Sequence, residues 1–207
     1  MSNIVSSWED YCSAEPVSRE TLAALRVYER LLREWSAKLN LVAPRTINDL
    51  WLRHFADSLQ LRKFTDGAEV LLDIGSGGGF PGLTLAIAAI GSGSIFHLVE
   101  SDQRKCAFLR AVALETGANV QIHVARIEEL TSVLPVPQVV TARALASLET
   151  LVAIADPYLA RGALGVFPKG RDYARELTLA ERRDNYVIET HESLTSSESK
   201  IITVRAV

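Results

Sequence analysis

The spacing of apolar residues predicts two amphipathic helices in the first third of the chain. Ser18 is a suitable N-cap for a first helix over residues 19–38. Its apolar positions recur every three or four residues and share one face: Leu25, Tyr28, Leu31, Leu32, Trp35 and Leu39. A second helix, over about residues 46–64, carries the apolar residues Leu50, Phe55, Leu59 and Leu61. The pattern before Gly67 is therefore helical.

After residue 67 the pattern changes to short apolar runs that alternate with helical segments. Strands are predicted at residues 69–74, 94–100, 120–125, 137–142, 163–168, 185–192 and 200–206, and helices near residues 81–90, 103–116, 147–159 and 172–183. Such alternation indicates a parallel sheet covered by helices on both faces. The polar stretch from Ser193 to Ser199 is too short for a parallel crossover, so the last two strands must be antiparallel.

These elements predict an α/β fold of the Rossmann-like class I methyltransferase layout. It has a seven-stranded, mostly parallel sheet with an antiparallel C-terminal hairpin, plus an N-terminal helical extension. We place the extension at residues 1–66 and the methyltransferase domain at residues 67–207. At 207 residues, the chain is long enough for one domain with a small appendage.

Charge is unevenly distributed. The whole chain has a net charge of −3 and a pI of about 5.8, so no overall positive field holds nucleic acid. Segment 26–63 has eight basic and four acidic residues, a local net charge of +4. Four arginines form a stripe opposite the apolar face of the first helix: Arg19, Arg26, Arg30 and Arg33. Two interpretations stay open, a solvated face or a face that contacts phosphate groups.

Several classes of protein are excluded by composition. The two cysteines, Cys12 and Cys106, are too few for a disulfide framework or a cysteine-ligated metal site. The longest apolar run, over residues 83–90, is far shorter than the roughly 18–20 residues that cross a bilayer, and the N-terminus has no signal-peptide pattern. We therefore expect a soluble, cytoplasmic protein without a membrane partner.

The strongest motif is a glycine-rich turn between a strand and a helix, Asp73-x-Gly75-x-Gly77-x-Gly79-Phe80-Pro81-Gly82. Such turns bind dinucleotides or adenosyl ligands in doubly wound folds. The Asp73 carboxylate would repel the pyrophosphate of NAD, whereas it can accept a hydrogen bond from the ammonium of S-adenosylmethionine, directly or through water. The pattern favours S-adenosylmethionine over NAD and over a purely structural turn.

Three acidic or apolar positions at the next two strand ends fit the same ligand. Glu100 ends the second strand, where a carboxylate can bind ribose hydroxyls, or be simply a solvated acid. Ile127 and Glu128 follow the third strand and can line an adenine pocket; a helix N-terminal acid pair is the alternative for Glu128.

The end of the fourth predicted strand limits which kind of atom can receive the methyl group, because a known motif is missing there. Residues 139–144 contain no Asn/Asp-Pro-Pro-aromatic motif, and neither cysteine is placed as a nucleophile. An acceptor with a free lone pair, such as guanine N7, needs no general base, so catalysis rests on placement. Arg143 would position the cofactor or the base O6, or else form a surface salt bridge.

These residues together resemble the bacterial small-subunit rRNA methyltransferase G family (RsmG, formerly glucose-inhibited division protein B). The matching stretches are Trp35–Leu41, Arg53–Leu59, Asp73–Gly82, Val99–Ser101, Arg126–Glu129, Thr141–Ala144 and Lys169–Gly170, within residues 22–205. The resemblance implies methyl transfer from S-adenosylmethionine to N7 of one guanosine in 16S rRNA, guanosine 527 in rRNA numbering. The implied partner is 16S rRNA, in the 30S subunit or an assembly intermediate, and we expect a monomer.

The resemblance also assigns site residues. By motif match, the implied cofactor contacts are Gly75, Phe80, Ile127, Glu128 and Arg143, and the implied substrate-side positions are Asn40, His54, Asp57 and Lys169. His54 and Asp57 are three residues apart and can instead pair with each other, and Asn40 can instead end a helix. The chain departs from the family pattern at Val42, where Thr or Ser is expected, and at Pro168, where Leu is usual.

Three rival functions are weighed against this one. The alternative on the same fold is a small-molecule methyltransferase that depends on S-adenosylmethionine, although the appendage is basic. An NAD-dependent oxidoreductase is disfavoured by Asp73. A non-enzymatic RNA-binding protein is disfavoured by the intact glycine turn. A steep loss of substrate binding with salt would separate an RNA substrate from a small neutral one.

Overall fold

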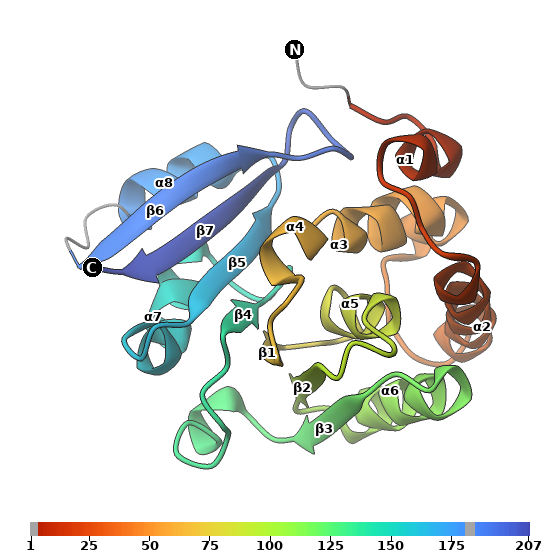
Figure 1. The fold of residues 1–207 in the computed structure, drawn as a ribbon, viewed down its shortest axis with the longest axis horizontal. Helices are drawn as coiled ribbons and strands as arrows, with labels where there is room; N and C mark the ends of the chain where they lie inside the picture. The colour runs from red at the N-terminus through yellow and green to blue at the C-terminus, as the bar shows by residue number, and fades with distance from the viewer. Residues whose placement is uncertain (1–3, 181–184) are drawn as a thin grey trace.

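A seven-stranded sheet forms the centre of the molecule in the computed structural model, which describes residues 4–180 and 185–207 (Figure 1). The strands are β1 (Val70–Ile74), β2 (Ile95–Glu100), β3 (Val120–Val124), β4 (Val139–Thr141), β5 (Leu164–Lys169), β6 (Tyr186–Glu192) and β7 (Lys200–Ala206). Their order is β3-β2-β1-β4-β5-β7-β6. The first five strands pair in parallel, and β7 pairs antiparallel with both β5 and β6. The predicted sheet, with its antiparallel C-terminal hairpin, is confirmed.

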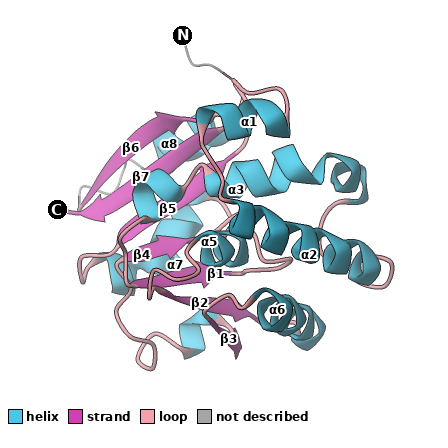
Figure 2. Cartoon of the chain, turned by 45° about the vertical axis from the view of Figure 1, so that its right-hand side comes forward, coloured by secondary structure: helices cyan, strands magenta, loops and turns pink. Residues whose placement is uncertain are grey.

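Helices cover both faces of this sheet because its strands alternate their buried side chains between two cores. On one face lie α2 (Arg19–Ser36), α5 (Gly82–Ala88) and α6 (Gln103–Thr116), packed on a core that includes Leu71. On the other lie α7 (Leu148–Leu159) and α8 (Tyr173–Ala180), around a core that includes Leu72 (Figure 2). The predicted end of the last helix, at residue 183, lies outside the described residues.

The segment after α2 corrects one prediction. Instead of one helix over residues 46–64, it forms a 3₁₀-helix (Pro44–Asp49), a π-helix (Trp51–Ala56) and the short helices α3 (Asp57–Leu59) and α4 (Arg62–Thr65). Leu50 and Phe55 are both fully buried although they are five residues apart. The i→i+5 period of a π-helix brings such residues to one side, which a regular α-helix does not. An additional helix, α1 (Trp8–Ala14), was not predicted.

The N-terminal helices share a hydrophobic core with the sheet domain. The ring of Tyr28 on α2 stacks on Phe80, with centroids 5.3 Å apart, and its hydroxyl donates a hydrogen bond to the carbonyl of Gly78. Trp35 contacts Phe108 of α6, as expected for a core residue. The predicted boundary near residue 67 falls between α4 and β1, and the core crosses it.

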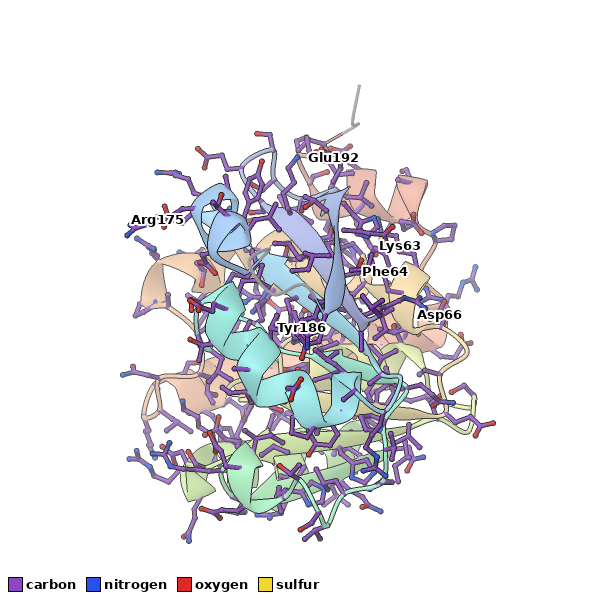
Figure 3. The ribbon with its side chains drawn as sticks, turned by 90° about the vertical axis from the view of Figure 1, so that its left-hand side faces the viewer. Lys63, Phe64, Asp66, Arg175, Tyr186 and Glu192 are labelled. Carbon is purple, nitrogen blue, oxygen red and sulfur yellow. The ribbon has the colours of Figure 1, made fainter. Side chains whose placement is uncertain are left out.

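One edge of the sheet is formed by β6, seen in Figure 3 with Tyr186 and Glu192 labelled. The Phe64 ring of α4 lies 4.8 Å from the His191 ring of β6, which anchors α4 against this edge. Within the described residues, the longest apolar helices are too short or too polar to span a bilayer.

Candidate functional site

A cavity of about 810 Å³ opens at the carboxyl ends of β1, β2 and β4, where ligands bind in open α/β sheets. It is lined on one side by the glycine turn, on another by the 3₁₀- and π-helical segments, and elsewhere by the ends of β2, β3 and β4. It includes these predicted cofactor positions: Gly75, Gly77, Phe80, Glu100, Ile127, Glu128 and Arg143. The predicted substrate-side residues His54 and Asp57 line it as well.

Several positions of the glycine turn have no room for a Cβ atom, so only glycine fits there. A Cβ at Gly78 would lie 2.6 Å from the carbonyl oxygen of Leu41, and one at Gly75 would lie 2.7 Å from the Leu145 side chain. Gly75 and Gly77 also have φ values of +68° and +56°, in the left-handed region that other residues rarely adopt. The turn thus brings bare backbone to the cavity.

Glu100 is held rigidly at the edge of the cavity. Its carboxylate accepts hydrogen bonds from the backbone N–H of Gly77 at 2.9 Å and from that of Asp102 at 2.8 Å. The side chain is buried, with 8% of the residue exposed, yet it lines the cavity. A carboxylate that is fixed in this way keeps lone pairs for hydroxyl donors of a ligand.

Asp73 lies behind the glycine turn. It is buried and is absent from the residues that line the cavity in the described part of the chain. Its Oδ1 accepts a hydrogen bond from the Thr141 hydroxyl at 2.8 Å, and burial raises its pKa to about 6. This geometry does not support direct contact with an ammonium in the cavity; it places Asp73 against Gly82, where it shapes the turn.

Arg143 connects several predicted site residues. Its guanidinium donates hydrogen bonds to Nδ1 of His54 at 2.7 Å and to Oδ2 of Asp57 at 3.1 Å. It also lies over the Phe80 ring, 5.0 Å from the centroid, in a cation–π contact. The alternative in which His54 and Asp57 pair with each other is not observed. The alternative of a salt bridge at Arg143 is observed, but the ion pair with Asp57 is half-buried at the cavity rather than on the open surface.

His54 is neutral, and its tautomer follows from its partners. Burial, with the positive charges of Arg143 and Arg53, lowers its pKa to about 3. Because Arg143 donates to Nδ1, the proton sits on Nε2, which donates to the Thr46 hydroxyl at 2.8 Å. Thr46 in turn donates to the carbonyl of Ala43 at 2.8 Å. Both ring nitrogens are engaged, so His54 fixes Arg143 rather than exchanging protons.

A second polar cluster fixes the turn between β6 and β7 against the site. The buried side chain of Gln60 accepts a hydrogen bond from the backbone N–H of Leu194 at 2.8 Å and donates to Oδ1 of Asp57 at 2.9 Å. The Thr195 hydroxyl donates to the same Asp57 oxygen at 2.7 Å. The sequence analysis did not identify Gln60, Thr46 or Thr195 as site residues. The one available signal was the short polar stretch over residues 193–199, whose side chains can form hydrogen bonds with a neighbouring segment.

The remaining predicted residues lie elsewhere. Lys169 forms an ion pair with Glu176 at 2.6 Å, donates to the carbonyl of Ala146, and lines a second cavity together with Pro168. Asn40 is exposed and, among the described residues, is outside the lining of either cavity. Val42 lines the larger cavity, so the missing hydroxyl there leaves an apolar contact.

The arginine stripe on α2 is partly neutralised by neighbouring acids. Arg30 pairs with Glu34 and with Glu115 of α6, and Arg33 pairs with Glu29. These exposed pairs add little stability, but they reduce the charge that the stripe offers to phosphate groups. The structure therefore favours the solvated-face interpretation for that half of the stripe.

We expect His54 and Asp73, the two buried groups with shifted pKa values at the site, to change the free energy of unfolding in opposite directions as pH rises. Between pH 3 and 6.5, the unfolded state binds more protons at His54, so stability rises with pH. Between about pH 4 and 6, the folded state binds more protons at Asp73, so its contribution falls as pH rises. Asp73→Asn should therefore steepen the gain in unfolding free energy with pH in that window, by at most about 1.4 kcal/mol per pH unit.

Urea denaturation at several pH values measures this slope. Asp66→Asn, which removes an exposed carboxylate, is the matched control and should leave the slope as in the wild type. A slope for Asp73→Asn parallel to that of the wild type would contradict the raised pKa of Asp73.

Comparison with known proteins gives consistent matches. A family model described as rRNA small subunit methyltransferase G matches residues 21–207. A protein of Rhodospirillum centenum named ribosomal RNA small subunit methyltransferase G is 48% identical over 184 residues, 88% of this chain and 82% of the relative. A Brucella abortus protein of the same name is 45% identical over 189 residues, 91% of this chain and 89% of the relative.

Solved structures show the same fold at low identity. The O-methyltransferase TomG from Streptomyces achromogenes is similar with a TM-score of 0.58 and 14% identity, over 95% of each chain. Precorrin-6y C5,15-methyltransferase from Geobacter metallireducens gives 0.57 and 18%, over 80% of this chain and 90% of that one. These likenesses confirm the predicted Rossmann-like methyltransferase fold.

Proposed function

The chain belongs to the rRNA small subunit methyltransferase G family, and on this premise we propose that it transfers a methyl group from S-adenosylmethionine to N7 of guanosine 527 of 16S rRNA. The observation that carries the proposal is the match of the family model to residues 21–207, which include every residue that lines the cavity. The substrate in this proposal is 16S rRNA in the 30S subunit or an assembly intermediate, and the enzyme acts as a monomer.

The residues around the larger cavity fit S-adenosylmethionine. Glu100, fixed by two backbone N–H groups, would accept from the ribose hydroxyls, and Ile127 and Glu128 would face the adenine. Gly75 and Gly77 leave room for the ligand to approach the backbone. When bound, the cofactor supplies a methyl group on a positively charged sulfonium. In this assignment Asp73 supports the cofactor through the shape of the turn.

The arrangement suits an acceptor that needs no proton removed. Guanine N7 has a lone pair and no hydrogen; as the N7–methyl bond forms, the carbon–sulfur bond breaks, sulfur keeps its electron pair and the positive charge passes to the purine. His54, with both ring nitrogens engaged, is not required as a base. The protein contributes placement of the reacting atoms and exclusion of water. Arg143, which lines both cavities, is the positioning group in this proposal.

The test is transfer of labelled methyl groups from S-adenosylmethionine to 30S subunits from a strain that lacks this gene, with the modified base mapped. Label on N7 at the single proposed position supports the function. Measurable cofactor binding without label on the rRNA would support the small-molecule methyltransferase instead. In that case binding of the true substrate should depend little on salt, whereas rRNA binding should weaken steeply with it.

A further inference from the structure

A second cavity, of about 440 Å³, lies beside the first at the carboxyl ends of β4 and β5. It is bounded by residues 168–172, by Glu176 of α8 and by the start of β7. The two cavities share Asp57, Ser199 and the wall formed by residues 143–146. The second cavity is thus adjacent to the cofactor cavity but reaches into a different part of the fold.

The shared wall has an unusual backbone. Ala144 has a φ of 55°, the single positive value at a non-glycine residue in the described chain. Such conformations cost energy and concentrate where a site demands them. Leu145 lies directly over Gly75 of the glycine turn and lines both cavities. The two cavities therefore meet at residues 143–146, so that a ligand at the glycine turn and a ligand in the second cavity approach each other there.

The cations around the second cavity are all paired, which indicates the kind of ligand that it accepts. Four cations line it, and each has a carboxylate partner: Arg143 with Asp57, Lys169 with Glu176, Arg171 with Glu198, and Lys200 with Glu192. By contrast, the cations Arg53, Lys105 and Arg126 on the larger cavity have no ion pair among the described residues. A phosphate group would bind preferentially to the unpaired cations of the larger cavity. The second cavity, with its cations already paired, suits a ligand with an uncharged polar ring.

Asp172, an exposed residue, is a hydrogen-bond acceptor that a ligand in the second cavity can use. It lines the second cavity, and no hydrogen bond or ion pair to its carboxylate exists within the described residues, whereas Asp57 and Glu176 are engaged. A carboxylate accepts from N–H donors, and guanine offers two on one edge, N1–H and the 2-amino group. Adenine presents an unprotonated N1 at the corresponding place. A guanidinium such as that of Arg143 suits the guanine O6.

We propose that the second cavity receives the target base as guanine turned out of the RNA stack, with Asp172 accepting hydrogen bonds from its N1–H and 2-amino edge. Enzymes that modify bases commonly expose them in this way. The proposal rests on the proposed function and adds to it a base-recognition site and a specificity-determining residue. O6 and N7 then face the junction of the two cavities at residues 143–146, toward the cofactor.

The test compares guanosine with inosine, which lacks only the 2-amino group, at the target position of 16S rRNA that has been joined from two pieces and assembled into 30S subunits. The wild type should methylate the guanosine substrate about tenfold faster or more in single turnovers. Asp172→Asn should slow the guanosine substrate by a similar factor and bring the two rates close together. Asparagine preserves size and helix-capping ability, and circular dichroism checks the fold.

Glu189→Gln is the matched control, because Glu189 is an exposed carboxylate on β6 outside both cavities. It should keep the wild-type rate and the wild-type preference. Arg175→Gln on α8, which projects away at the periphery in Figure 3, should do the same. Cofactor affinity, measured by calorimetry, should be unchanged in all three variants. An Asp172→Asn enzyme that retains the preference for guanosine would overturn the proposal. A wild type that methylates neither substrate would overturn the proposed function instead.

Discussion

Arg143→Lys is expected to reduce the rate of methyl transfer by about a hundredfold. Arg143 is held at three points, by His54, by Asp57 and by the Phe80 ring. A lysine ammonium lacks the planar fork that makes two of these contacts at once, so the group would lose its orientation. Misplacement by about 1 Å at a site that works by positioning can cost such a factor. Single-turnover transfer to 30S subunits measures the effect.

The control is Arg62→Lys, which alters an exposed arginine paired with Asp66 and should leave the rate unchanged. His54→Asn tests whether His54 acts through Arg143. If it does, His54→Asn combined with Arg143→Lys should be little worse than Arg143→Lys alone, because both changes disrupt one unit. A wild-type rate in Arg143→Lys, or fully additive losses in the double variant, would contradict the positioning role. Comparing the change in cofactor affinity with the change in rate shows which ligand Arg143 positions.

The sheet and the part of the cavity at the strand ends were predictable, because their signals are local. Strand ends follow directly from apolar runs, and parallel strands bring their carboxyl ends to one edge. Glu100 ends its strand, and Gly75 and Ile127 lie just past theirs, so their convergence on one cavity follows from the order of elements. The helical periodicity of α2 likewise identified the buried Leu25 and Tyr28.

The features that were missed depend on contacts between distant residues or on exact backbone geometry. Gln60 and Leu194 are 134 positions apart, and Arg30 and Glu115 are 85 apart, so nothing local connects either pair. The break in the helix over residues 46–64 arises from a π-helical turn, which the α-helical template does not represent. For Asp73, the motif identified the residue but not on which side of the turn its carboxylate would lie.

Gly82→Ala is expected to destabilise the fold and to weaken cofactor binding. Its Cβ would lie 2.5 Å from Cβ of Asp73 and 2.6 Å from Oδ2, both far inside contact distance. Asp73 cannot retreat, because β1 pairs with β2 at Leu98 and with β4 at Thr141. The start of α5 must therefore move, and overpacking of this kind costs about 1–3 kcal/mol. Urea denaturation measures the loss of stability, and calorimetry the loss of cofactor affinity.

Gly170→Ala is the control for the added methyl group, since a Cβ there would meet no heavy atom within 4 Å and its φ is not in the left-handed region. It should leave the unfolding free energy within about 0.5 kcal/mol of the wild type. In Gly82→Ala, the unfolding free energy and the cofactor affinity should decrease together. The same displacement of α5 strains the core and moves the glycine turn away from the ligand. Lost stability with intact cofactor affinity would show instead that the turn is positioned independently of the contact between Asp73 and Gly82.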